Sequence, residues 1–256
     1  MTSKKTNIMA VIQARMGSTR LPGKVLMEIG GKPALYHVVS RVRKAAAIDR
    51  VVVAATRNPI DDPLQACCET LGVACFRGDE DDVLDRFYQT AVQYPADVIV
   101  RITADCPLLD PNVTDHVVHA FLEGQCDYAS NTQVCTYPDG LDTEVFSFQA
   151  LERAWREARL LSEREHVTPY IKNHPEIFRL KSVENDCDLS ALRWTLDEPT
   201  DLEFIRAVYE NISCEFFGME EILTLLQSHP DIGRINQGIE RNEGYQKSLR
   251  EDRIVK

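Results

Sequence analysis

Residues 11–26 read VIQARMGSTRLPGKVL and combine the end of an apolar strand with a cationic loop. The apolar stretch stops at Ala14, and Arg15, Arg20 and Lys24 follow among glycine, serine, threonine and proline residues. Glycine lets the backbone approach a ligand closely, and arginine and lysine donors suit phosphate oxygens. Ligands of open α/β sheets bind beyond the carboxyl ends of the strands. The stretch therefore predicts a phosphate site directly after the first strand.

Two common phosphate-binding loops do not fit this stretch. A P-loop has the spacing G-x-x-x-x-G-K-[ST]. Here five residues separate Gly17 from Gly23, and Val25 stands where the P-loop has its hydroxyl residue. The G-x-G-x-x-G pattern of dinucleotide-binding folds is also absent. The loop is therefore not that of a P-loop ATPase or a dehydrogenase.

The first half of the chain alternates short apolar stretches with longer segments of helical period. The predicted strands cover residues 8–14, 50–56, 73–78 and 97–104. The predicted helices cover residues 32–46, 62–72, 81–94 and 111–124. Such alternation with short connections is typical of βαβ units, which build a parallel sheet with helices on both faces. We predict an α/β fold of the Rossmann-like, three-layer α/β/α type with a mostly parallel sheet.

The pattern changes after residue 125, where short β-like pieces surround a PDG turn. We interpret residues 126–146 as a small β-hairpin insertion in a single domain that spans residues 1–256. Further on, helices are expected near 147–161 and 163–173 and a strand at 178–184. Residues 193–212 indicate a strand, a turn and a helix that starts with a capping box of Thr200 and Glu203.

Composition limits the possible partners. The chain has 256 residues, 44% of them hydrophobic, and a formal net charge of −11. This acidity argues against a general nucleic-acid binder. Residues 1–50 nevertheless hold ten Lys/Arg and two Asp/Glu. A basic segment on an acidic body favours a local anion site, although an uneven surface without a role is the alternative.

The sequence shows no sign of export. No apolar run approaches the roughly 20 residues that cross a bilayer, and the first apolar stretch runs into arginine, unlike a signal peptide. The eight cysteines form no C-x-x-C pair. Scattered cysteines of this kind indicate reduced thiols rather than disulfides or a zinc site. We expect a cytoplasmic protein without membrane or nucleic-acid partners.

Six motifs together resemble one family. IQARMGSTRLPGK is similar to the first motif of the cytidylyltransferases that activate acidic sugars, the CMP-Kdo and CMP-sialate synthetase superfamily. The resemblance continues through FRGDEDDVLDRF, VRITADCPLLD, PDGLDTEVF, REHVTPYI and WTLDEPTDLE, over about four fifths of the chain. Within the superfamily it is strongest to the spore coat polysaccharide biosynthesis protein F group. The resemblance implies nucleotidyl transfer, in which an acceptor oxygen attacks the α-phosphorus of a nucleoside triphosphate and pyrophosphate leaves.

This resemblance assigns the nucleotide to the first motif. Lys24 is expected to contact the β- and γ-phosphates, and Arg15 the α-phosphate or the oxygens bridged by a metal. The other expected nucleotide-binding residues are Ala14, Gly17, Ser18, Arg20, Gly78 and Arg86. For Arg86 a solvated helix position is the alternative. Arg15, Lys24 and Asp105 are the expected catalytic residues.

Two aspartates are the predicted Mg²⁺ ligands, since hard carboxylate oxygens suit that cation. Asp105 follows the fourth predicted strand and matches a metal-binding Asp of the family, with Ala104 in place of the family's glycine. Asp197, just after a late predicted strand, matches the second. The alternative is that both aspartates only form turns before Pro107 and Pro199.

Four residues are predicted to bind the acceptor: Arg101, Asp142, Glu144 and His166. Arg101 interrupts an apolar strand and needs an anionic partner, either on the acceptor or in a structural carboxylate. Asp142 and Glu144 follow the PDG turn, where relatives place acceptor contacts. His166 lies in the REHVT motif, where a helix-surface or interhelix role is the alternative.

The expected reaction is Mg²⁺-dependent transfer of CMP from CTP to a sugar, sugar acid or phosphorylated acceptor for surface polysaccharide or glycoconjugate synthesis. The base preference rests on the resemblance alone, so GTP and UTP remain open. A glycosyltransferase of the same fold is one alternative, but the D-x-D metal motif is missing from the fourth-strand region. A non-catalytic nucleotide-binding subunit is the other, and the joint presence of Arg15, Lys24, Asp105 and Asp197 argues against it. A homodimer built through the insertion is also expected.

Overall fold

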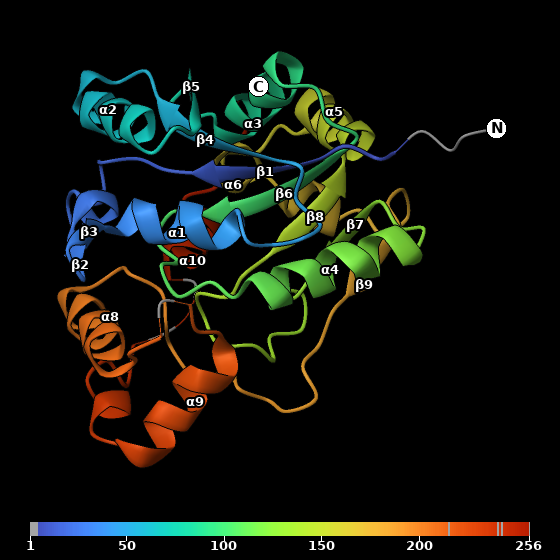
Figure 1. Ribbon diagram of the computed structural model, residues 1–256. Coiled ribbons are helices and arrows are strands. Elements are labelled where there is room, and N and C mark those ends of the chain that lie inside the picture. Colours follow the sequence, from blue (N-terminus) through green and yellow to red (C-terminus); the bar gives the residue numbers. More distant parts are fainter. Residues whose placement is uncertain (1–4, 215, 240, 242, 256) are drawn as a thin grey trace.

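Strand β1 (Ile8–Gln13) lies inside a seven-stranded sheet with the order β5-β4-β1-β6-β8-β7-β9 (Figure 1). The computed structural model describes residues 5–214, 216–239, 241 and 243–255. The other strands of this sheet are β4 (Arg50–Thr56), β5 (Ala74–Gly78), β6 (Val98–Thr103), β7 (Tyr128–Ser130), β8 (Glu144–Ser147) and β9 (Leu180–Ser182). Strands β5, β4, β1 and β6 are parallel to one another. The predicted mostly parallel sheet is confirmed.

Helices cover both faces of the sheet and complete the three predicted layers. One face carries α1 (Ala34–Val42), α2 (Asp62–Thr70) and α4 (Pro111–Glu123), which share an apolar cluster with the central strands. The other face carries α3 (Val83–Gln93), α5 (Phe148–Glu157) and the short α7 (Pro169–Lys172). Strand β1 is apolar at consecutive positions because helices cover it from both sides.

Strand β8 runs antiparallel to β6, and this reversal decides which side chains meet at the edge of the sheet. The register places Glu144, the first residue of β8, opposite Arg101 of β6. Strand β7 pairs antiparallel with β8 and parallel with β9. The segment 126–146 therefore adds two strands to the main sheet, and residues 131–143 connect them at the carboxyl ends of β1 and β6.

A third apolar cluster lies beyond that edge. It joins Trp194 to α8 (Pro199–Asn211), α9 (Met219–Ser228) and the small hairpin of β2 (Glu28–Ile29) and β3 (Lys32–Pro33). Figure 1 shows α8 and α9 side by side in orange, below the sheet. The remaining elements are α6 (Leu161–His166), α10 (Glu243–Arg250) and three short 3-10 turns at Lys24–Leu26, Pro59–Asp61 and Ile232–Arg234.

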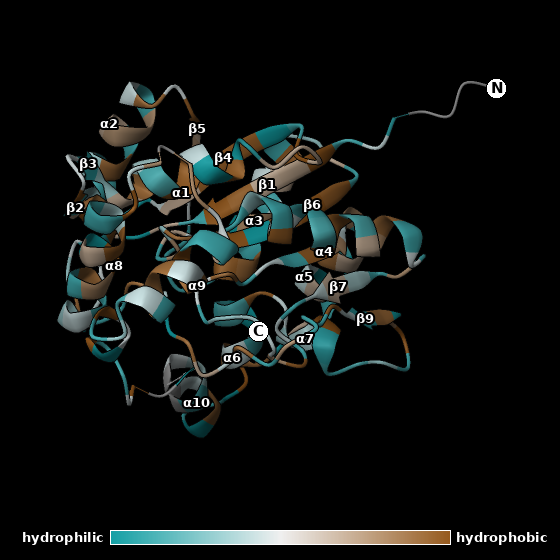
Figure 2. Cartoon of the chain, turned by 60° about the horizontal axis from the view of Figure 1, so that its bottom comes forward, coloured by the Kyte–Doolittle hydropathy of each residue, from teal (hydrophilic) through white to brown (hydrophobic). Residues whose placement is uncertain are grey.

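Hydropathy follows these layers. In Figure 2 strands β1 and β6 are mostly brown, whereas the surrounding helices mix teal and brown. The large side chains that are almost fully buried include Trp194, Tyr128, Phe87 and Phe146. Among the described residues, no helix is both long and apolar enough to cross a membrane.

Two predictions about elements in the second half are wrong. The helix expected at 163–173 is divided into α6 and α7, because Val167 between them has a φ of 72°. The strand expected before residue 197 forms only a single bridge, between Arg193 and Asp139. The rest of that segment forms no strand; Trp194 packs in the third apolar cluster, and the Leu196 N–H donates to the carbonyl of Asp105 at 2.8 Å.

The predicted capping box of Thr200 and Glu203 is also wrong. Helix α8 begins at Pro199, and proline suits the first helical position because its missing N–H needs no partner there. Thr200 therefore lies inside the first turn. Asp201 takes the capping role, since its Oδ2 accepts hydrogen bonds from the backbone N–H groups of residues 197 and 198 at 2.9 Å each.

Candidate active site

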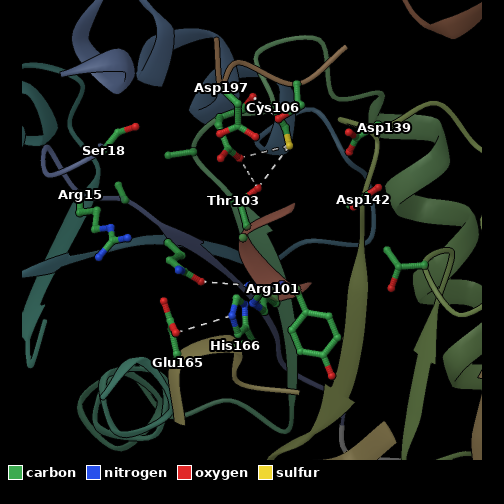
Figure 3. Close-up of a pocket in the computed structure, with 18 of the residues that line it drawn as sticks. Arg15, Ser18, Arg101, Thr103, Cys106, Asp139, Asp142, Glu165, His166 and Asp197 are labelled. Carbon is green, nitrogen blue, oxygen red and sulfur yellow. Dashed lines mark hydrogen bonds and ion pairs between the residues drawn. The ribbon is translucent and has the colours of Figure 1, made fainter. Parts of the chain in front are cut away.

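A pocket of about 500 Å³ opens at the carboxyl ends of β1 and β6 (Figure 3). Its wall combines segments that are far apart in the sequence. The part termed the loop end consists of Ala14, Arg15, Ser18, Thr19, Arg20, Lys24, Asp105 and Asp197. The part termed the β8 end consists of Asp139, Asp142, Glu144, Arg101, His166 and Lys172. Figure 3 shows Asp139 and Asp142 on the side of the pocket away from Arg15.

The loop after β1 folds back on itself and presents Lys24. Gly23 has a φ of 73°, a left-handed conformation that favours glycine, and its N–H donates to the carbonyl of Met16 at 3.1 Å. The carboxylate of Asp61 accepts from the backbone N–H of Met16 at 2.8 Å. The 3-10 turn that follows buries Val25 and leaves Lys24 in the pocket wall.

Lys24 is held between the two predicted metal ligands. Its Nζ lies 2.7 Å from Asp105 Oδ2 and 2.6 Å from Asp197 Oδ1. Burial lowers the pKa of Lys24, but the two carboxylates outweigh burial and raise it above its usual value. Burial likewise raises the pKa of Asp105, yet Lys24 and the Thr103 hydroxyl hold it at about 2. Lys24 and Asp105 are therefore both ionised at neutral pH.

Backbone and side-chain contacts bring Asp197 to this cluster. The N–H of Leu196 donates to the carbonyl of Asp105 at 2.8 Å, which places the two aspartates side by side. Asp201 is fully buried and accepts two hydrogen bonds from Arg193, each at 2.9 Å. The same Asp201 accepts from the Asp197 N–H at the start of α8, so it fixes the position of Asp197.

The other predicted residues of the loop also line the pocket: Ala14, Arg15, Ser18 and Arg20. Arg20 lies 2.9 Å from Asp197 and 3.2 Å from Glu198. The Ser18 hydroxyl accepts from the N–H of Leu21 at 3.2 Å. Within the described part of the chain, the exposed side chain of Arg15 has no hydrogen-bond or ion-pair partner, so its guanidinium is available to a ligand.

Gly17, Gly78 and Arg86 are not among the described residues that line the pocket. Arg86 is buried, so the solvated alternative is wrong. One of its nitrogens donates to the carbonyl of Asp79 at 2.6 Å, and the other two have no hydrogen-bond partner. Burial, followed by the nearby Arg15, lowers its pKa to about 10. A Cβ at Gly78 would lie 2.8 Å from Arg86 Cγ, so this glycine makes room for the arginine.

At the β8 end, Arg101 pairs with Glu144 across the two antiparallel strands. Glu144 is 4% exposed and accepts from the hydroxyls of Tyr128 and Thr168 at 2.6 Å each. Lys172 Nζ lies 3.4 Å from the same carboxylate. Burial raises the pKa of Glu144, but Lys172 and Arg101 outweigh burial and hold it at about 2. Arg101 thus has a structural carboxylate, and acceptor contacts of the pair stay a prediction.

Asp139 and Asp142 form the opposite wall of the β8 end. Arg241 donates to Asp142 Oδ1 at 2.5 Å and lies 3.6 Å from Asp139 Oδ1. Arg193 lies 3.2 Å from Asp139 Oδ2. Burial and the neighbouring carboxylate raise the pKa of Asp139 to about 7. Burial also raises the pKa of Asp142, although Arg241 opposes the shift.

Gly140 connects the two ends of the pocket. Its φ of 108° is unfavourable for other residues, and a Cβ there would lie 2.6 Å from the carbonyl carbon of Trp194. The Trp194 N–H donates to the carbonyl of Asp139 at 2.6 Å. The turn that carries Asp139 therefore packs directly on the segment that carries Asp197.

His166 lines the β8 end and also contacts α10. Its Nε2 is hydrogen-bonded to Ser248 Oγ at 2.9 Å, and its ring meets Tyr245 edge-on with centroids 5.0 Å apart. Burial lowers the pKa of His166 to about 4, so the ring is neutral at neutral pH. The interhelix alternative is thus present in the structure, while acceptor binding by His166 stays a prediction.

Sequence reasoning missed several residues of the wall: Thr103, Asp139, Lys172, Arg193 and Tyr245. Asp139 had a signal, because it stands three residues before Asp142 in the same PDGLD motif. Lys172 and Tyr245 lie in helical segments with ordinary composition. Only the fold brings these helices to the sheet edge.

A cationic loop after the first strand and two aspartates at the same sheet edge are the groups that a nucleotidyltransferase site requires. A sequence model of the cytidylyltransferase family matches residues 9–222, and the chain belongs to that family. It is 37% identical to the spore coat polysaccharide biosynthesis protein SpsF of Bacillus subtilis over 233 residues, which cover 88% of this chain and 96% of SpsF.

Solved structures agree with this assignment. A cytidylyltransferase from Leptospira borgpetersenii superimposes with a TM-score of 0.87 and 33% identity, covering 93% of this chain and 100% of that one. The fold also matches CMP:2-keto-3-deoxy-manno-octonic acid synthetase complexed with CTP, with a TM-score of 0.62 and 20% identity over 80% of this chain and 99% of that one.

Proposed function

We propose that the protein transfers CMP from CTP to a hydroxyl group of a sugar, sugar acid or phosphorylated acceptor and releases pyrophosphate. The observation that carries this proposal is the cluster of Lys24, Asp105 and Asp197 in one pocket beside Arg15. The family match supports the cytidine nucleotide. The match to SpsF, named for spore coat polysaccharide synthesis, supports a surface glycan as the destination of the product.

In this proposal the triphosphate lies at the loop end. The acceptor oxygen forms a bond to the α-phosphorus, and the bond from that phosphorus to the pyrophosphate oxygen breaks. Negative charge grows on the leaving pyrophosphate, and preorganised cations stabilise such charge strongly in a buried site. Arg15 and Lys24 supply these cations, since Arg15 has no protein partner in the described part of the chain and Lys24 is buried and charged.

We propose Asp105 and Asp197 as the ligands of Mg²⁺. Both carboxylates lie within hydrogen-bond distance of the same ammonium group, so they are close enough to share one cation. Mg²⁺ is commonly held by one or two carboxylates together with phosphate and water oxygens. When bound, Mg²⁺ supplies charge neutralisation on the triphosphate.

The acceptor is placed at the β8 end. Asp139 and Asp142 offer carboxylate oxygens to sugar hydroxyls, and Asp139, with its pKa of about 7, is suited to take the hydroxyl proton near neutral pH. Lys172 and Arg101 offer positive charge to an acidic group on the acceptor. The name of the CMP:2-keto-3-deoxy-manno-octonic acid synthetase, whose fold this chain shares, is consistent with a sugar acid.

The first experiment measures pyrophosphate release with each of the four nucleoside triphosphates and Mg²⁺. The acceptors are a panel of sugar acids, sugar 1-phosphates and small phosphonates. Release that needs CTP and one acceptor class supports the proposal and identifies the acceptor. Release with GTP alone keeps the reaction but rejects the cytosine preference. Nucleotide binding without release from any pair counts against transfer.

We also propose a cytoplasmic homodimer that uses the segment 126–146. Nucleotide substrates and free thiols, which the described cysteines are, suit the cytoplasm. Val134 in this segment is 48% exposed and offers an apolar contact. Deleting residues 130–140 would remove the buried side chains of Ser130, Asn131 and Tyr137 and so disturb the fold, which makes a point substitution the better test. Val134→Lys is the better variant, and light scattering should show the mass of one chain.

A further inference from the structure

The end of the chain forms a wall on the pocket. The C-terminal segment, defined as Arg241 and residues 243–255, lies beyond residue 222, where the family match ends. It packs on α6, and its attachment is specific. Asp252 accepts from the N–H and the hydroxyl of Ser162 at 3.0 and 2.7 Å, and the Val255 N–H donates to the carbonyl of Arg159 at 2.9 Å.

Helix α10 of this segment reaches the β8 end. Gly244 and Tyr245 line the pocket beside His166. The Ser248 hydroxyl is hydrogen-bonded to His166 Nε2 at 2.9 Å and to Glu165 Oε2 at 2.8 Å, which holds α10 against α6. The Tyr245 ring therefore keeps a fixed position relative to a predicted acceptor residue.

Arg241 is not among the described residues that line the pocket, but it contacts two carboxylates that do, Asp139 and Asp142. Its guanidinium donates to Asp142 at 2.5 Å and to the carbonyl of Tyr137 at 3.2 Å. Its Nε is buried without a hydrogen-bond partner and lies 3.6 Å from Asp139. One arginine from the C-terminal segment thus separates two carboxylates that would otherwise repel each other.

We infer that the C-terminal segment is part of the acceptor site, with Tyr245 as a specificity-determining residue and Arg241 as a positioning residue for Asp139 and Asp142. The inference rests on the proposed function. The recognised acceptor is a polyhydroxylated ring. Its hydroxyls donate to the two carboxylates, and its C–H face packs on the aromatic ring, the usual combination of apolar wall and few fixed polar groups in ligand pockets.

The alternative role for this segment is structural, since it also covers α6. The two roles predict different effects on nucleotide affinity and acceptor affinity when the segment is altered. A structural segment supports the whole pocket, so its loss weakens nucleotide and acceptor together. A specificity wall contacts only the β8 end, so its loss weakens the acceptor alone.

Isothermal titration of the full chain with Mg²⁺ and α,β-methylene-CTP, which does not transfer CMP, separates these roles. The acceptor probes are 3-deoxy-manno-octulosonate, N-acetylneuraminate and glucose 1-phosphate. Tyr245→Ala is expected to raise the Kd of the probe that binds wild type at least about tenfold, as for an anchoring aromatic residue. The Kd of α,β-methylene-CTP should change less than about twofold.

The matched control is Leu249→Ala. Leu249 lies on the same helix, is 41% exposed and is not among the described residues that line the pocket. Both affinities should stay at the wild-type values. An unchanged acceptor Kd in Tyr245→Ala, or an equal loss of nucleotide affinity, overturns the inference. Binding of none of the three probes to wild type also overturns it.

Arg241 is tested by steady-state kinetics. Arg241→Ala should raise the acceptor KM about tenfold, with little change in the KM for CTP, because the two carboxylates lose their spacing. Arg241→Lys keeps a cation between them and should restore most of the acceptor KM. A merely structural role predicts no rescue and a parallel change in both KM values.

Failure of the proposed function gives a different result from failure of this inference. A wild-type protein that releases no pyrophosphate but binds a probe, more weakly in Tyr245→Ala, rejects the transfer reaction and keeps the acceptor wall. A protein that releases pyrophosphate with equal acceptor KM in wild type, Tyr245→Ala and Arg241→Ala keeps the reaction and rejects the wall.

Discussion

The loop end and the β8 end share one pocket but treat charge in opposite ways. At the loop end, Lys24 lies within 2.7 Å of both Asp105 and Asp197, and the pKa of Asp105 falls to about 2. At the β8 end, burial and mutual repulsion dominate for Asp139, whose pKa rises to about 7. The pKa of Asp105 at the loop end is thus far below neutral pH, whereas the pKa of Asp139 at the β8 end lies near it.

This difference suits two different ligands. A polyanion such as a triphosphate needs fixed cations that are already in place. A sugar presents hydroxyl groups that both donate and accept, and carboxyl groups near their pKa are able to do either. Glu144 is the exception at the β8 end, because Arg101 and Lys172 keep it ionised as a structural charge.

The largest expected effect is the loss of folding stability when the Glu144 carboxylate is removed. Glu144→Ala leaves Arg101 without its carboxylate and two buried hydroxyls without their acceptor. Breaking a buried ion pair from one side costs about 3–5 kcal/mol. Urea denaturation at pH 7.5 measures the change, with Glu123→Ala as an exposed control. A loss below about 1 kcal/mol would show that Glu144 is not a structural charge.

The next effect tests the loop end. Lys24→Ala and Asp105→Ala should each lower turnover at least about 100-fold, the size of one preorganised electrostatic contact. Lys32→Ala, which removes an exposed lysine just outside the loop, should leave turnover near the wild-type value. Pyrophosphate release under saturating CTP and acceptor is the measurement. Near-normal turnover in either variant removes that residue from the mechanism.

A smaller effect sharpens the contrast through pH. The folded pKa of Asp139, about 7, is above its unfolded value, so the folded state binds more protons between pH 4 and 7 and stability falls as pH rises through that window. Asp139→Asn should therefore gain stability relative to wild type between pH 4 and pH 8, with an upper limit of about 4 kcal/mol for about three pKa units. Thermal unfolding across this range shows the gain, with Asp231→Asn as the reference for an exposed aspartate. A constant difference would place the pKa of Asp139 outside the window.

His166 gives the smallest effect, with the opposite sign. Its folded pKa of about 4 is below the unfolded value of 6.5, so the unfolded state binds more protons and stability is lost as pH falls from 6.5 to 4. His166→Gln should lack this loss and gain about 2 kcal/mol relative to wild type between pH 7 and pH 5. Parallel urea curves at the two pH values check it, and identical pH slopes would contradict a neutral, buried ring.

Local patterns predicted the parallel half of the molecule well. Apolar runs and helical period predicted strands β1, β4, β5 and β6 and the helices beside them. These signals are clear because parallel strands are covered by helices on both faces and are therefore apolar throughout. Lys24 and Asp105 follow strands β1 and β6, so this pattern also places them at one edge of the sheet. Asp197 was assigned from the resemblance to the family, and the described residues directly before it form no strand. The functional roles of all three stay predictions.

The antiparallel half was less accessible, since nothing in the sequence gives the direction in which β8 enters the sheet. Without that direction, Arg101 and Glu144 are two isolated charges rather than a cross-strand pair. The predicted start of α8 was wrong for a local reason. The helix begins at Pro199, so Asp201 rather than Thr200 accepts the hydrogen bond from the backbone N–H that precedes the helix. The contribution of α10 depends on tertiary packing alone.

The reversed strand also has a consequence for how such proteins diversify. Because β8 starts where β6 ends, residues 131–143 contribute Thr132, Asp139 and Asp142 to the pocket without being part of the parallel strands. Connecting segments accept insertions and substitutions more readily than the strands that they join. Changes in this connection and in the C-terminal segment can therefore reshape the β8 end of the pocket while leaving the loop after β1 as it is.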